Sequence, residues 1–187
     1  MIAPFTLLFE EEPNPGPGLP EAMRAVYNGD WRLPPLPAHR PLVWTNFVVS
    51  HDGRIAFNQP GWNGGNAISR GSRHDHWLME LVRARADAIL VGNATLRAAR
   101  RHRWAPGEVF AWPEFAALRA AEGRPALPAL VILSASGELP AAVALELPRT
   151  LFLLTTAEGA ERARQRYPHL ICLTGADGQL DLSAALA

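Results

Sequence analysis

The segment from Pro41 to Ala56, PLVWTNFVVSHDGRIA, constrains the fold of this chain more than any other stretch. Its first part is an almost unbroken apolar run, which only Thr45 and Asn46 interrupt. A strand that is apolar on both faces is expected at the centre of a sheet covered on both sides. We therefore predict a central strand here, which the turn at Gly53 ends.

Five residues with polar or special backbone character follow this apolar run: Ser50, His51, Asp52, Gly53 and Arg54. In open α/β sheets ligands bind at the carboxyl ends of strands, so this turn is a candidate site. An ordinary surface turn is the alternative, because Asp-Gly is a common turn signal and Asp52 could serve only the turn. His51 is a candidate proton donor, although a solvent-exposed turn histidine is the favoured interpretation.

Strands and helices alternate along the rest of the chain. The patterns predict helices at 22–27, 72–85, 112–122 and 158–167, and strands at 88–91, 129–133, 149–154 and 170–173. Ser72 is the expected N-cap of the second of these helices, with Asp75 three residues on. The alternation predicts an α/β fold with βαβ units and a mainly parallel sheet that carries helices on both faces.

Small residues follow four of the predicted strands, namely Ser50, Gly92, Ser134 and Thr155. They would line one edge of the sheet, where a nucleotide could lie. The stretch from Gly92 to Thr95 opens a short helix, and such a turn exposes N–H groups that suit phosphate. That helix then becomes basic through Arg97, Arg100, Arg101, His102 and Arg103. A solvated face is favoured there over contact with a phosphorylated ligand, and the chain has neither a G-x-G-x-x-G motif nor a Walker loop.

Composition narrows the class of protein. Lys+Arg and Asp+Glu both number 18, so the formal net charge is zero, which argues against binding nucleic acid or a membrane surface by bulk charge. The single cysteine, Cys172, lies in an apolar run and is expected in the core; one cysteine fits a reducing cytoplasm. Neither a signal peptide nor a membrane-spanning stretch is evident, and we expect a cytoplasmic protein. No metal site is expected, because His74 and His76 are two residues apart on a helix and face different directions.

Two motifs resemble the pyrimidine reductases of riboflavin biosynthesis. The first is a strand that ends in S-x-D-G-[RK]-I-A, here residues 50–56, and the second is R-A-x-x-D-A-[IV]-L-V-G-x-x-T, here residues 83–95. This is the RibD C-terminal-domain family, which is similar in fold to dihydrofolate reductase. The resemblance covers most of the chain from Tyr27 on. It implies a Pro-rich N-terminal arm at 1–40 and a reductase domain at 41–187.

The resemblance implies hydride transfer from NADPH to the ribosyl C1 of a phosphoribosylamino-pyrimidine. Three positions would lie at the reaction centre, namely Asp52, Ser50 and Asn46. Six would hold the cofactor, namely Gly53, Gly92, Asn93, Thr95, Ser134 and Ser136, the two serines near the adenosine 2′-phosphate. Two would contact the substrate, namely Ser72 and Arg97.

The chain departs from the family pattern in three places. Asn46 stands where many relatives have Lys, and Ala98, Ala99 and Arg100 occupy a region that usually carries an acidic residue. The family normally continues beyond the position of Ala187 with a glycine-rich segment and further strands, so we expect a C-terminally incomplete domain. A homodimer or a complementing C-terminal chain would then complete it. The alternative function is a non-catalytic nucleotide-binding or assembly protein that keeps the fold; dihydrofolate reductase proper is less favoured, because its acidic pterin-binding residue has no clear counterpart.

Overall fold

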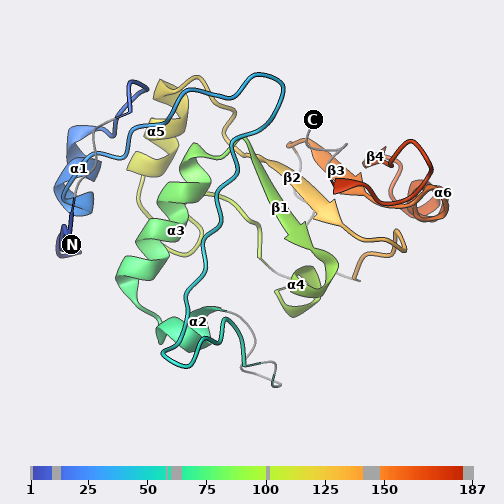
Figure 1. Ribbon diagram of the computed structural model, residues 1–187, viewed down its shortest axis with the longest axis horizontal. Coiled ribbons are helices and arrows are strands. Elements are labelled where there is room, and N and C mark those ends of the chain that lie inside the picture. The colour runs from blue at the N-terminus through green and yellow to red at the C-terminus, as the bar shows by residue number, and fades with distance from the viewer. Residues whose placement is uncertain are drawn as a thin grey trace.

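The computed structural model of the chain describes residues 2–9, 14–57, 59, 65–99, 102–140 and 148–182. These residues form an α/β protein with a four-stranded, all-parallel sheet (Figure 1). The elements in chain order are α1 (Glu21–Tyr27), α2 (Gly65–Ser69), α3 (Arg73–Arg85), β1 (Ala88–Gly92), α4 (Asn93–Ala98), α5 (Glu114–Ala121), β2 (Ala129–Leu133), β3 (Leu151–Leu154), α6 (Ala157–Arg166) and β4 (Ile171–Leu173). The parallel sheet confirms the α/β class predicted from the alternation of strands and helices.

The strands lie side by side in the order in which they occur in the chain, β1-β2-β3-β4. One row of the register runs from Val91 through Ile132 and Leu153 to Cys172, so these four side chains share a face. The first three are buried, and Cys172 packs against the same apolar core. The prediction that this cysteine is a core residue is confirmed.

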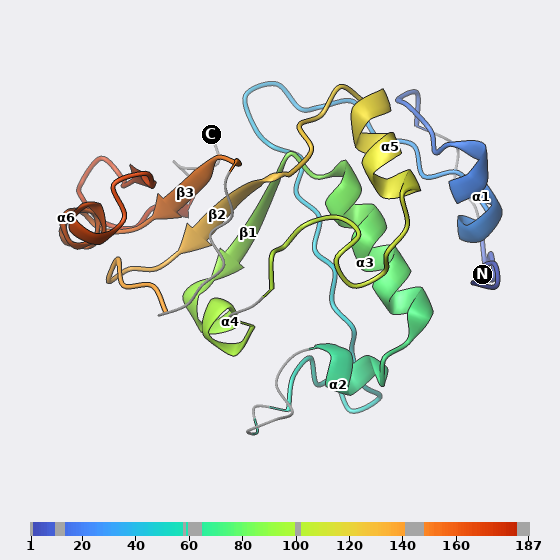
Figure 2. The same cartoon turned by 180° about the vertical axis from the view of Figure 1, so that it is seen from behind.

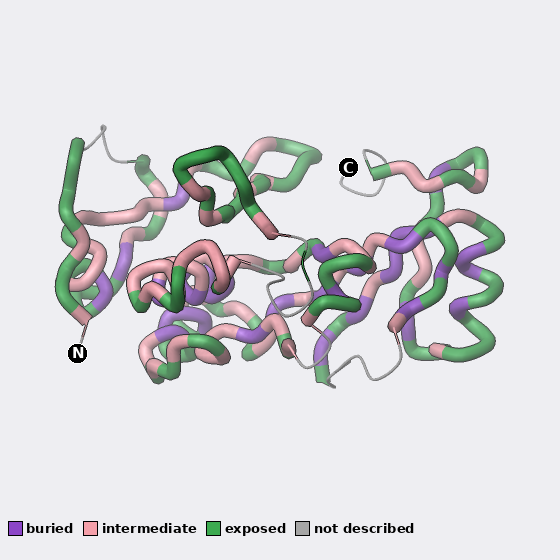
Figure 3. Tube along the Cα trace, turned by 90° about the horizontal axis from the view of Figure 1, so that it is seen from below, coloured by how far each residue is buried: buried purple, intermediate pink, exposed green. Residues whose placement is uncertain are grey.

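A second apolar core lies among the helices beside β1. Its fully buried members include Met23 of α1, Trp77 and Leu81 of α3, and Phe115 of α5. The opposite view shows α3 and α5 side by side, with α1 next to them (Figure 2). The strand nearest to these helices is β1, and the other strands of the sheet lie beyond it. Buried residues accordingly occur in both parts of the molecule (Figure 3). The helices α3 and α5 pack mainly against each other. That helices cover both faces of the sheet therefore remains a prediction.

Most predicted elements are present. Ser72 caps α3 by accepting a hydrogen bond from the Asp75 N–H at 3.4 Å, as the sequence predicted. The helix predicted before Gly123 is α5, and Gly123 ends it in the left-handed conformation with φ +69°. The Pro-rich arm contributes Leu19 and Met23 to the second core, so it does more than wrap the surface.

The prediction of a central strand from Pro41 onward is wrong. Residues 41–50 are irregular, and the apolar side chains of Val43, Phe47 and Val49 are more than half exposed. The segment is held near its two ends, where Trp44 meets Trp31 edge-on and Val48 approaches Gly65. An apolar run shows which residues would tolerate burial, but a strand also needs a neighbouring strand to pair with, and this segment has none.

This correction changes the position of β1. The strand predicted at 88–91 is β1, which among the described residues pairs only with β2 and therefore forms an edge of the sheet. Only Val91 is buried in β1, and Leu90 is about half exposed. The prediction of a basic helix end at Arg100 and Arg101 falls on two residues outside the described ones.

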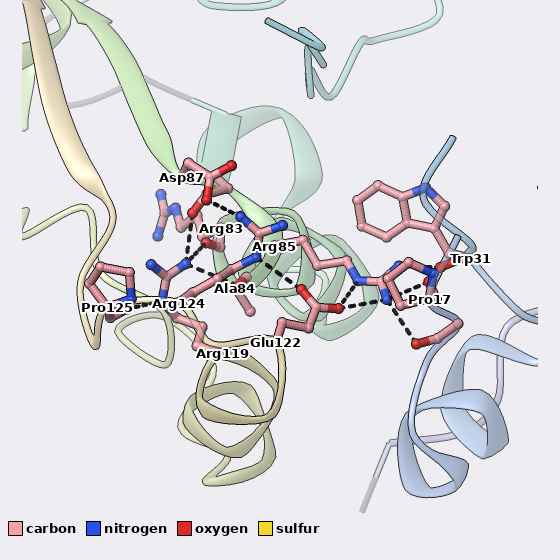
Figure 4. A network of polar contacts seen from close by, with 12 residues as sticks. Pro17, Trp31, Arg83, Ala84, Arg85, Asp87, Arg119, Glu122, Arg124 and Pro125 are labelled. Atoms are coloured by element: carbon pink, nitrogen blue, oxygen red, sulfur yellow. Dashed lines mark hydrogen bonds and ion pairs between the residues drawn. The ribbon is translucent and has the colours of Figure 1, made fainter. Parts of the chain in front are cut away.

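A polar network joins the helical part to the sheet (Figure 4). The buried guanidinium of Arg119 donates from Nη1 to the backbone oxygens of Ala84 at 3.0 Å and Ala86 at 2.7 Å. Its Nε donates to the Pro125 oxygen at 2.7 Å. Arg119 thereby ties the end of α3, which leads into β1, to the chain that leads from α5 into β2.

Candidate functional site

Hydrogen bonds join the carboxyl ends of β1 and β2. The Asn93 side-chain amide, directly after β1, donates to Ser134 Oγ at 3.2 Å and to the Glu138 backbone oxygen at 2.8 Å. The Ser134 hydroxyl donates to the same Glu138 oxygen at 2.9 Å. The structure therefore brings together Gly92 and Ser134, two of the four residues that the sequence assigned to one edge of the sheet, with Asn93 between them. Ser50 was assigned to the same edge, but it ends no strand of this sheet, so the prediction that it follows one of the strands is wrong.

The end of β3 joins the same row. The hydroxyls of Thr155 and Thr156 both donate to the Ala135 backbone oxygen, at 3.1 and 3.0 Å. Thr156 also caps α6 by accepting from the Gly159 N–H at 3.0 Å. The carboxyl ends of β1, β2 and β3 thus form one continuous polar edge.

Not every group on this edge faces solvent. Ser134 and Thr155 are 4% and 0% exposed, and their hydroxyls are used within the protein. Ser136 and Thr95 are exposed. Gly92 has an ordinary φ of −76°, and a Cβ built on it would meet no atom within 4 Å. The open part of the edge is therefore the space at Gly92 and the loop at Ser136, whereas Ser134 acts as an internal support.

The turn after the apolar segment is closed by its own side chains. Ser50 Oγ donates to Asp52 Oδ1 at 2.5 Å and accepts from the Arg54 N–H at 3.1 Å. Arg54 Nε forms an ion pair with Asp52 Oδ2 at 2.8 Å, and Gly53 sits in the left-handed conformation with φ +82°. The glycine here serves the backbone of the turn, for which the sequence proposed a cofactor contact.

These contacts fix the charge of Asp52. The hydrogen bond from Ser50 holds the pKa of Asp52 below its ordinary 3.8, and the Arg54 charge acts in the same direction, whereas desolvation acts against them. Asp52 is therefore a carboxylate near neutral pH and has no proton to give. Its geometry matches the alternative that the sequence left open, in which this carboxylate supports the turn.

A cavity of about 570 Å³ adjoins this turn. Its lining is partly apolar and partly polar, and consists of Val49, Ser50, His51, Phe57, Ala67, Ile68 and Arg70. Its volume lies within the roughly 300–1,000 Å³ typical of small-molecule sites. The sequence indicated Ser50 and His51 but missed Arg70, which has a left-handed backbone with φ +52° after α2 and carries no motif. The helix α2 and the helix α4 lie toward the same end of the molecule, the end to which β1 points (Figure 1).

Three predicted site residues do not line this cavity. Asn46 is exposed in the irregular segment. Ser72 uses its hydroxyl to cap α3, and Arg97 is exposed in the last turn of α4. The roles at the reaction centre and with the substrate that the resemblance implied for them stay predictions.

A cluster of buried titratable side chains, which no sequence pattern indicated, lies apart from the polar edge and the cavity. Glu80 accepts from the Gly107 N–H at 2.7 Å and the Val109 N–H at 2.8 Å, and pairs with Arg83 at 3.2 Å. Burial raises the pKa of Glu80 above 4.5, although these hydrogen bonds and Arg83 act against the shift. His102 lies with Nε2 2.8 Å from Arg83 Nη2 and Nδ1 3.1 Å from Glu108. Arginine can only donate, so His102 Nε2 accepts and the ring is neutral.

No protein-family model matches the chain, and no curated protein matches it either. Within the part of the chain that the structure describes, no helix is long and apolar enough to cross a bilayer. The same residues contain no group of three or more His, Cys, Asp or Glu placed to hold a metal ion. The function must therefore be argued from the polar edge and the cavity.

Proposed function

We propose that the chain is an NADPH-dependent reductase with a dihydrofolate reductase-like fold, acting on a phosphoribosylamino-pyrimidine or a related small phosphorylated substrate. The observation that carries the proposal is the hydrogen-bonded row of strand ends from Gly92 to Thr156. Nucleotides bind at the carboxyl ends of parallel strands in folds of this class. The cofactor, when bound, supplies the hydride, and the protein has to hold and orient two ligands.

The open part of the edge fits a dinucleotide. The empty space at Gly92 allows a phosphate to approach the backbone closely, which a side chain at this position would hinder. The Thr95 hydroxyl, in the helix that begins after Gly92, and the Ser136 hydroxyl, in the loop after β2, are exposed and can donate to phosphate oxygens. Donors of this kind need no large positive field, in keeping with a formal net charge of zero.

The cavity fits the second ligand. Phe57 and Ile68 offer apolar surface for a flat ring, and Arg70 offers a cation for a phosphate. In this proposal Asp52 holds the turn that forms one wall, because it is ionised and paired with Arg54. His51 lines the cavity and is the candidate proton donor.

A titration with NADPH tests the proposal. We expect quenching or enhancement of the reduced-nicotinamide fluorescence on binding, a rise in the midpoint of thermal unfolding, and oxidation of NADPH when the phosphorylated pyrimidine is added. Arg70→Gln should raise KM for that substrate with little effect on NADPH binding, while Arg73→Gln, an exposed change at the first residue of α3 that does not line the cavity, should alter neither. The absence of any fluorescence or thermal response at millimolar NADPH would rule the reductase out. Measuring the mass in solution would show whether a homodimer or a second chain is needed.

A second candidate is a non-catalytic nucleotide-binding protein that keeps the fold. The observation in its favour is that the hydroxyls of Ser50, Ser134 and Thr155 are already bonded within the protein. Asn46, implied at the reaction centre, does not line the cavity. This candidate predicts that NADPH binds without being consumed in the presence of any phosphorylated pyrimidine.

A further inference from the structure

The cavity beside the turn at Gly53 has one wall that comes from α2 and the residue after it. Ala67 and Ile68 of α2 line the cavity, and so does Arg70, which follows this five-residue helix. No residue of α2 is buried, so little apolar packing holds the helix in place. Figures 1 and 2 both show α2 at the N-terminal end of α3. The shape of the cavity therefore depends on the polar contacts that fasten α2 to α3.

One side-chain hydrogen bond fastens the two helices together. His76 Nε2, near the start of α3, lies 3.0 Å from Asn66 Oδ1 of α2. An amide oxygen can only accept, so the hydrogen of this bond belongs to His76. Within the described part of the chain, no other side-chain hydrogen bond joins α2 to α3. The Asn66 backbone oxygen also accepts from the Gly71 N–H at 3.3 Å, so Asn66 holds α3 with its side chain and the end of α2 with its backbone.

The backbone between the two helices is strained at Arg70. Arg70 and Gly71 both have left-handed conformations, with φ +52° and +70°. This conformation is unfavourable for a residue that carries a Cβ, so a corner free to relax would leave it and carry the Arg70 side chain away from its place in the cavity. Asn66 and His76 lie on either side of Arg70 in the chain, and the bond between them closes the corner around it. That bond thereby keeps Arg70 in the cavity wall.

Arg70 is available to a ligand, whereas the described arginines nearest to it in the chain are engaged. It is exposed, and among the described residues nothing forms a hydrogen bond or an ion pair with it. The guanidinium carbon of Arg73 lies 5.0 Å from the centre of the Phe110 ring. Arg54 pairs with Asp52 at 2.8 Å, and neither Arg54 nor Arg73 lines the cavity. Arg70 is therefore the arginine that can meet an anion in this cavity, and its exact place decides the affinity.

We propose that His76, acting through Asn66, is a positioning residue that holds Arg70 where it binds the phosphate of a ligand in the cavity. The inference rests on the proposed function, which places a phosphorylated substrate there. His76 itself does not line the cavity, so it acts on the ligand only through the corner. His74, two residues earlier in α3, has a different partner, because its Nε2 lies 2.9 Å from the Ala3 backbone oxygen in the N-terminal arm. The two histidines therefore hold different segments of the chain.

The test measures dissociation constants by calorimetry, without turnover, for uridine 5′-monophosphate and uridine, which differ only in the phosphate. Charge-assisted hydrogen bonds to a phosphate change affinity by roughly 10- to 100-fold. We expect His76→Leu to weaken the monophosphate by about tenfold and uridine by less than about twofold. His76→Gln should restore most of the affinity, because its amide can donate to Asn66. His74→Leu is the matched control: it removes a histidine from the same end of α3 and should leave both affinities unchanged.

Two further variants show whether His76 acts through the corner. Asn66→Ala should reproduce the selective loss, and because Asn66 is exposed this change leaves the apolar core intact. Arg70→Gln sets the size of the loss. Adding His76→Leu to Arg70→Gln should weaken the monophosphate no further, since a positioning residue then has no arginine left to position. Circular dichroism confirms that each variant is folded.

Several results would overturn the inference. Losses that multiply in the double variant would mean that His76 and Arg70 act independently. Equal losses for the monophosphate and uridine in His76→Leu, or the same loss in His74→Leu, would assign the effect to a general disturbance of α3. Wild-type protein that responds to NADPH but binds the monophosphate no better than uridine would reject the inference and leave the cofactor part of the proposed function standing. Wild-type protein that binds none of the three ligands would reject both.

Discussion

Two glycines at the carboxyl edge of the sheet, Gly92 and Gly137, differ in whether the fold itself requires glycine there. Gly137 follows β2 with φ +71°, and a Cβ built on it would lie 1.9 Å from the Gly159 backbone oxygen. Gly92 has φ −76° and open space around the same position. The first glycine is required by the protein's own backbone, whereas no described residue would meet a Cβ at Gly92.

Alanine substitutions separate these two cases. Gly92→Ala should leave the free energy of unfolding unchanged or raise it by up to about 1 kcal/mol, because alanine reduces the freedom of the unfolded chain. The added methyl should weaken NADPH binding by roughly tenfold, since it occupies the space proposed for a phosphate. Chemical denaturation and nucleotide titration measure the two effects. Unchanged NADPH affinity in a well-folded Gly92→Ala would remove this glycine from the proposed site.

Gly137→Ala is the structural counterpart. Its left-handed backbone and the clash with Gly159 should lower the free energy of unfolding by at least about 2 kcal/mol. Loss of nucleotide binding in this variant would follow from loss of the fold, and circular dichroism would show it. A stable Gly137→Ala protein would contradict the geometry of the loop after β2.

The protonation state of His102 makes the stability of the folded protein depend on pH. Burial lowers the pKa of His102 below 6.5, Arg83 lowers it further, and Glu108 acts against them. The unfolded chain takes up this proton near pH 6.5 and the folded chain only at lower pH. The stabilisation is therefore present above that pH and is lost as the pH falls through the folded-state value. Glu80 has the opposite sign, because its raised pKa makes stability fall as the pH rises above 4.5.

His102→Gln isolates the histidine from Glu80. Glutamine can accept from Arg83 and donate to Glu108 without titrating. We expect denaturant unfolding to show that the wild type loses stability relative to His102→Gln as the pH is lowered from above 6.5 toward 5. A stability difference that stays constant over this pH range would mean that His102 is not the titrating group. Glu80 remains in both proteins, so its own contribution cancels.

Arg85 fastens the N-terminal arm to α3 through contacts with backbone carbonyls. Its guanidinium is fully buried, donates to the Trp31, Pro17 and Gly18 oxygens, and pairs with Glu122 at 2.8 Å. Removal of one member of a buried ion pair costs about 3–5 kcal/mol. Arg85→Ala should therefore lower stability by about that amount and expose residues 14–33 to limited proteolysis. Arg24→Ala, an exposed change on α1, should stay within about 0.5 kcal/mol of wild type. Equal protease resistance in both variants would show that the arm is held by its apolar contacts alone.

The sequence predicted elements well where the deciding interactions are local. Ser72 caps α3 three residues from its partner, and β2 has the predicted bounds. It failed for residues 41–50, because strand formation depends on a neighbouring strand. The contacts of Arg85 could not be predicted in the same way, because the carbonyls it binds lie 54 to 68 residues away in the chain. At the candidate site the sequence indicated Asn93 and Ser134, but Arg70 belongs to no motif and could be found only from its position in space.

The molecule contains two separate apolar cores. The sheet core and the helical core are separate clusters of buried residues, and Arg119 links the segments that connect them. Burial lowers the pKa of this arginine below its ordinary value, although it stays charged at any ordinary pH. Its donors contact the backbone oxygens of Ala84 and Ala86 at the end of α3.

Arg119→Met tests whether this link makes the two cores unfold together. Methionine keeps much of the volume of the side chain but leaves the oxygens of Ala84, Ala86 and Pro125 without their donor. We expect two unfolding transitions in place of one, with hydrogen exchange of α3 and α5 becoming faster than that of β2 and β3. Leu81→Ala, a cavity in the helical core that leaves the link intact, should lower stability by about 2–5 kcal/mol in a single transition. If Arg119→Met also unfolds in one step with uniform exchange, the cores are coupled through another contact and the arginine only stabilises the end of α3.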